Sequence, residues 1–84
     1  MSDHLIHLAQ AGNTVVPAVL ALESLGFTVE VHDRSVSASS DTARYTAGDP
    51  VAVLGLIKLI ELRGEAWRPA DSEVDETLRR YPRL

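Results

Sequence analysis

The chain has 84 residues, no cysteine and a net charge of −4, from 12 acidic and 8 basic residues. This length leaves room for one hydrophobic core, so we expect a single compact α+β domain over residues 1–84. The acidic balance opposes the phosphate neutralisation that drives binding to DNA or RNA, which argues against a nucleic-acid partner. Without cysteine the chain can form no disulfide and no thiolate metal site.

The first segment, 4–9, reads His-Leu-Ile-His-Leu-Ala and is too short to distinguish a strand from the start of a helix. We expect a short strand. A turn over 10–14 then precedes an apolar helix over 13–25, with Asn13 or Thr14 as N-cap and Gly26 as the terminating residue. The chain start lacks a basic region followed by an apolar stretch, so we expect no secretory signal and a cytoplasmic location.

The segment 27–33 alternates apolar and polar residues over a full strand length, with Phe27, Val29 and Val31 expected to face the core. The segments 35–40 and 43–46 extend this strand into a three-stranded antiparallel meander. Their apolar residues are small, so we expect this end of the sheet to be its edge, with the serines of 35–40 in solvent.

The dipeptide Asp49-Pro50 predicts the start of a second helix, which runs over 51–63 and ends at Gly64. Lys58 and Glu61 mark its polar side, yet apolar side chains project close to Lys58 on that side. Gly55 lies there too, and an internal glycine costs about 1 kcal/mol relative to alanine unless close backbone approach offsets the loss. We therefore expect another element or another protein to pack on this side.

A third helix is predicted from Asp71 or Ser72 to about Arg80, after a linker that contains Trp67. Three apolar residues form a narrow stripe at i, i+4 and i+7, namely Val74, Leu78 and Tyr81. We expect this stripe to lay the helix on the body of the protein and Trp67 to clamp it there. The predicted order is thus β-α-β-β-β-α-α.

Candidate chemistry along the chain is weak. His4 and His7 lack a third ligand at a fixed spacing, so we expect no metal site and no cofactor. His32 and Asp33 are neighbours that point apart on a strand, and no nucleophile accompanies them. The turn Gly12-Asn13-Thr14 could offer backbone N–H groups to an anion, but it lacks the lysine of a phosphate-binding loop. We expect no enzyme activity.

The two apolar helices carry more apolar surface than so small a domain can bury, and this excess surface is the main functional clue. Each is shorter than the ~20 residues needed to span a bilayer, so we expect no membrane insertion. The leading hypothesis is a non-catalytic protein-binding module, a small acidic inhibitor-, immunity- or antitoxin-type protein that occludes a partner protein. The candidate contact residues are Val51, Leu54, Lys58, Glu61, Leu62, Trp67, Glu73, Asp75 and Glu76.

Two other hypotheses stay open. The first is an obligate homodimer in which the helices over 50–63 pack on each other about Gly55. The second is a small anion- or nucleotide-binding protein that uses the turn Gly12-Asn13-Thr14 together with His7 or His32.

Overall fold

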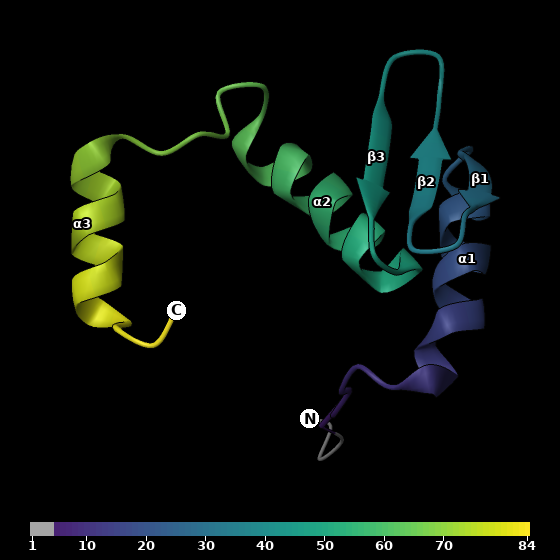
Figure 1. The fold of residues 1–84 in the computed structure, drawn as a ribbon, viewed down its shortest axis with the longest axis horizontal. Coiled ribbons are helices and arrows are strands. Elements are labelled where there is room, and N and C mark those ends of the chain that lie inside the picture. Colours follow the sequence, from purple (N-terminus) through teal and green to yellow (C-terminus); the bar gives the residue numbers. More distant parts are fainter. Residues whose placement is uncertain (1–4) are drawn as a thin grey trace.

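The computed structural model describes residues 5–84. A short 3₁₀ turn, η1, leads into a helix, a three-stranded antiparallel sheet and two further helices (Figure 1). The elements are η1 (Gly12–Thr14), α1 (Val15–Ser24), β1 (Thr28–Val31), β2 (Val36–Ser39), β3 (Arg44–Ala47), α2 (Pro50–Arg63) and α3 (Asp71–Arg80). The α+β class and the order of helix, meander and two helices are confirmed.

The sheet has the strand order β1-β2-β3, and its two faces differ sharply in polarity. On one face, Val29 pairs with Ala38 and Ala38 with Tyr45 across the sheet. On the other face, Glu30 pairs with Ser37 and Ser37 with Thr46. Side chains alternate between the faces of a strand, so the period-2 pattern of the sequence places all the apolar residues on one side.

Helices α1 and α2 both cover the apolar face of the sheet and pack against each other. The core consists of the buried residues Leu22, Val36, Ala38, Val53 and Ile57. Phe27 and Tyr45 add an edge-to-face aromatic pair at its margin, with ring centroids 5.8 Å apart. One apolar layer of two helices on one face of a sheet therefore makes up the hydrophobic interior.

The boundaries of α2 have the causes that the sequence predicts. The Asp49 carboxylate accepts a hydrogen bond from the Ala52 N–H at 2.8 Å, which identifies Asp49 as the N-cap. Gly64, with φ of +73°, ends the helix, and Gly26 has a φ of +93° just after α1. Thr14 is the N-cap residue of α1, but its side chain makes no capping hydrogen bond, because its hydroxyl donates to the Ala11 carbonyl instead.

The strand predicted over 4–9 is wrong for residues 5–9, which have no regular secondary structure; His4 lies outside the described residues. Leu8 and Ala9 lie beside Val51 and Leu54 instead. The Gln10 side chain also donates a hydrogen bond to the Asp49 carboxylate at 3.0 Å. The segment 5–11, called the arm below, is thus attached to the helices and does not pair with the sheet.

The 35–40 segment is the centre of the sheet rather than its edge, because β2 pairs with β1 on one side and with β3 on the other. Val36 and Ala38 are buried in the core, and Ser37 is only 1% exposed. The Ser37 hydroxyl shares a 2.9 Å hydrogen bond with the Thr46 hydroxyl, which satisfies a polar group that was expected in solvent. Val31, expected in the core, is 73% exposed on the edge strand β1.

The third helix also departs from the prediction. Helix α3 forms with the expected bounds but stands apart from the sheet, α1 and α2 (Figure 1). Its stripe of Val74, Leu78 and Tyr81 is exposed, and Trp67 is not part of the core. The Arg63 side chain holds the linker through a hydrogen bond to the Trp67 carbonyl at 2.8 Å and an ion pair with Glu73 at 3.8 Å.

The one-sided core predicts a strong dependence of stability on Leu22, which is fully buried. Replacement of Leu22 by alanine should lower the free energy of unfolding by about 2–5 kcal/mol, measured by urea denaturation. Leu20→Ala is the matched control on the same helix, because Leu20 is largely exposed; we expect a change within about 0.5 kcal/mol. Equal losses would contradict this assignment of the core.

Candidate interaction surface

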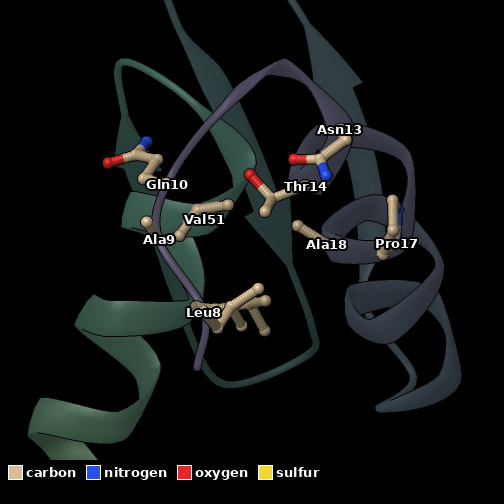
Figure 2. Close-up of a pocket in the computed structure, with 9 residues that line it drawn as sticks. Leu8, Ala9, Gln10, Asn13, Thr14, Pro17, Ala18 and Val51 are labelled. Carbon is tan, nitrogen blue, oxygen red and sulfur yellow. The ribbon is translucent and has the colours of Figure 1, made fainter. Parts of the chain in front are cut away.

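An apolar groove lies between α1 and α2, with the arm along it (Figure 2). It encloses a pocket of about 440 Å³. The described residues that line it carry no charge: they are Leu8, Ala9, Gln10, Asn13, Thr14, Pro17, Ala18, Val51 and Leu54. Such a lining suits an apolar side chain or a helix ridge better than a charged ligand.

The outer side of α2 continues this groove toward the end of the helix. Val51 and Leu54 are half-buried in the groove wall, whereas Leu62, two turns further on, is 74% exposed. Lys58 and Glu61 form an exposed ion pair at 3.9 Å between them. The five residues that the sequence places in contact with a partner on this helix are therefore accessible or line the groove.

Gly55 lies on the same outer side of α2, and no contact within the described chain requires a glycine at this position. A Cβ built at this position has no neighbouring atom within 4 Å. The cost of an internal glycine, about 1 kcal/mol relative to alanine, is thus not offset by close packing inside the chain. Close approach by a second molecule is a physical reason for a glycine at this point.

The arm and α3 add further apolar surface that the sequence did not assign to binding. Leu5, Ile6 and Leu8 of the arm are between 77% and 84% exposed. Val74 and Leu78 of α3 are exposed together with Tyr81, the residue directly after the helix, and α3 is otherwise strongly polar. The amphipathic pattern of α3 was visible in the sequence, but its stripe was assigned to the core of the same chain.

The remaining predicted contact residues lie around the linker and on α3. The Glu73 carboxylate accepts a hydrogen bond from the Ala70 N–H at 2.8 Å and also pairs with Arg63, so it stabilises the start of α3. Asp75 and Glu76 are exposed and point about 60° and 160° away from Leu78 around the helix. Trp67 is 37% exposed under the Arg68 guanidinium, at 4.5 Å from the ring centroid.

The whole chain exposes far more surface than a compact monomer of its mass. Its accessible surface is 7076 Å² at 9.1 kDa, against about 4,900 Å² for a typical folded monomer of that mass. Its radius of gyration is 15.7 Å, against about 12 Å for a compact domain of this length. The projecting α3 and the arm account for this open shape (Figure 1).

Within residues 5–84, no group of three histidine, cysteine or acidic side chains is placed to hold a metal ion. The Thr14 N–H and hydroxyl both donate to the Ala11 carbonyl, at 3.0 and 2.7 Å, and are thus occupied inside the turn. Neither His7 nor His32 lines the pocket.

Comparison with protein-family models, with curated proteins and with solved structures finds no match for this chain. Among the helices of residues 5–84, none combines the length and the apolar character needed to cross a bilayer.

Because the groove lining carries no cation among the described residues, we expect phosphate to leave the turn Gly12–Thr14 unaffected. The amide resonances of Gly12, Asn13 and Thr14 should not shift at phosphate concentrations up to about 10 mM, above the Kd of a millimolar site. Saturable shifts confined to these amides would instead support the anion-binding hypothesis.

Asp49 both caps α2 and holds the arm, and two substitutions separate these roles. Asp49→Ala should lower the free energy of unfolding by about 1 kcal/mol through loss of the cap. Gln10→Ala removes only the exposed hydrogen bond between the arm and Asp49. It should change the free energy of unfolding by less than about 0.5 kcal/mol. Thermal unfolding followed by circular dichroism measures the stability of both variants. If the two variants lose equal stability, the effect of Asp49 comes from its contact with the arm and not from the cap.

Proposed function

We propose that this protein is a non-catalytic protein-binding module. Its binding surface combines the groove between α1 and α2, the outer side of α2 and the apolar stripe of α3. The observation that carries the proposal is the amphipathic helix α3, which stands apart from the rest of the described chain with its stripe exposed. Helices shorter than about 12–15 residues are marginal in water on their own, so this ten-residue helix needs a surface to pack on.

The composition of the surface supports a protein as the ligand. Charged residues are depleted at the centres of protein interfaces and common at their rims. Here the groove lining is uncharged, and the Lys58–Glu61 ion pair lies on the exposed side of α2 near Leu62. This arrangement fits an apolar centre with a polar rim.

One candidate partner is a different protein, bound by a small acidic inhibitor-, immunity- or antitoxin-type domain. The net charge of −4 supports it, because long-range attraction would steer such a chain toward a basic target. Trp67, Glu73, Asp75 and Glu76 would add contacts beside the apolar centre. The absence of enzyme activity and the cytoplasmic location expected from the sequence stay predictions.

A second candidate is self-association, and the open space at Gly55 favours it. Helices approach each other closely where a glycine replaces a larger side chain. The two candidates share the same surface and differ in the protein that covers it.

Photo-crosslinking in cells tests the proposal directly. A photoreactive phenylalanine analogue placed at Leu62 or Leu78 should form covalent adducts with protein, because both side chains are exposed on the proposed surface. The same analogue at Thr28, on the polar outer face of the sheet, is the control. Mass spectrometry of the adducts identifies the partner as a second copy or as another protein.

Leu54→Ser and Leu62→Ser should each weaken the crosslink formed from Leu78, since they remove apolar contact area without a change in charge. Adducts from Leu62 and Leu78 no more abundant than those from Thr28 would contradict the proposed function. Unchanged crosslinking in both serine variants would contradict the assignment of the surface.

A further inference from the structure

We propose that the partner at this surface is a second copy of the same chain, and that the two copies exchange α3. The stripe of Val74, Leu78 and Tyr81 of each copy lies across the groove between α1 and α2 of the other. This inference rests on the proposed function and identifies the partner of that same surface. The symmetry is that of a closed two-fold dimer in which every contact occurs twice.

The amount of uncovered surface is more than a partner of ordinary interface size would cover. The excess over a compact monomer is roughly 2,200 Å² per chain, the difference between 7076 Å² and about 4,900 Å². A standard interface covers only about 800 Å² on each partner. If two copies cover each other's excess, the pair buries at most about 4,400 Å², which is in the range of obligate homodimers and of permanent complexes between different chains.

Each chain also carries both halves of the contact. The stripe of α3 is a narrow apolar ridge, and the groove wall of Val51, Leu54 and Pro17 is an uncharged apolar hollow. If the two copies exchange α3, the stripe and the groove of each copy are covered by the same stripe-to-groove contact. The net charge of −4 per chain does not oppose it locally, because neither the stripe nor the described groove lining contains a charged residue.

The linker directs α3 outward, toward a neighbour. Arg63, at the end of α2, binds the Trp67 carbonyl and pairs with Glu73 at the start of α3. These contacts hold α3 beyond the end of α2, away from the groove of its own chain (Figure 1). Domain swapping exchanges an identical element between two copies, and a helix that stands apart from its own chain is available for such an exchange.

The position of Gly55 completes the contact. It lies on the outer side of α2, one residue after the groove residue Leu54, with open space where a side chain would be. A partner helix that crosses α2 there gains close backbone approach. A side chain added at Gly55 would therefore begin in open space on its own chain and point toward the partner.

The first test is the absolute mass of the full chain by light scattering behind a sizing column, over a hundredfold dilution from about the micromolar range. We expect twice the monomer mass of 9.1 kDa. Leu78→Gln, on the stripe, should raise the dimer dissociation constant at least about tenfold. Ser72→Gln is the matched control, because Ser72 is exposed on the same helix and lies about 160° from Val74 and about 120° from Leu78 around it. We expect this variant to leave the dissociation constant within about threefold.

Gly55→Gln should likewise weaken the dimer at least about tenfold, although glutamine is the better helix former. Helical content measured at the same protein concentration separates loss of contact from loss of folding, since the added Cβ has no atom within 4 Å beyond its two chain neighbours and the adjoining backbone of its own helix. A dimer of unchanged affinity would contradict the proposed crossing at Gly55.

Disulfide trapping tests the arrangement independently of affinity, because the natural chain has no cysteine. One chain carries Leu54→Cys and a second carries Leu78→Cys, and the mixture is oxidised mildly. We expect the mixed 54–78 disulfide between copies to predominate. Predominance of 54–54 disulfides, which indicates α2 packed on α2, or of 78–78 disulfides would overturn the exchange.

A monomer at every concentration would also overturn this inference. The proposed function fails separately: it fails if photo-crosslinking at Leu62 and Leu78 yields no adduct above the Thr28 control. Adducts with a different protein, together with a monomeric mass, would refute the exchange of α3 and leave the binding function in place.

Discussion

Leu22 of α1, Val53 of α2 and Ala38 of β2 are fully buried in one cluster, and the rest of the structure depends on this one-sided contact. Both helices lie on the same face of the sheet, so the opposite face carries polar side chains such as Ser37 and Thr46. Within residues 5–84, α3 does not supply a third layer over the outer sides of the helices, because it stands apart from α1, α2 and the sheet (Figure 1). The apolar residues there stay uncovered.

This uncovered surface connects the fold to its proposed role. The arm, the groove and the outer side of α2 adjoin one another, and α3 projects beyond the end of α2. Neither a disulfide nor, among the described residues, a metal cluster reinforces the small core. A partner that binds only the folded chain would stabilise it by mass action. Folding and association are therefore expected to be coupled in this protein.

Local patterns predicted the elements well where the cause is local. The cap at Asp49, the glycine ends at Gly26 and Gly64, and the alternation that places Val29 and Ala38 on one face all appear in the structure. Errors arose where long-range packing decides. The apolar residues of 5–9 suited a strand equally well, but none of them pairs with the sheet, and Leu8 and Ala9 line the groove beside the helices. Ser37 is polar and yet buried, because it lies in the central strand beside Thr46.

The sequence by itself determined the α+β class, the bounds of α2 and α3, and the apolar character of the outer side of α2, since these follow from periodicity and from residues at helix ends. Among the predicted site residues, Val51 and Leu54 reach the groove as expected of a contact surface. Only the tertiary structure decided that α1 contributes Pro17 and Ala18 to that groove. It also decided that α3 stands apart from the sheet, α1 and α2. The sequence of an amphipathic helix shows that its apolar stripe is favoured in contact with another apolar surface. The geometry of the linker decides which surface is within reach.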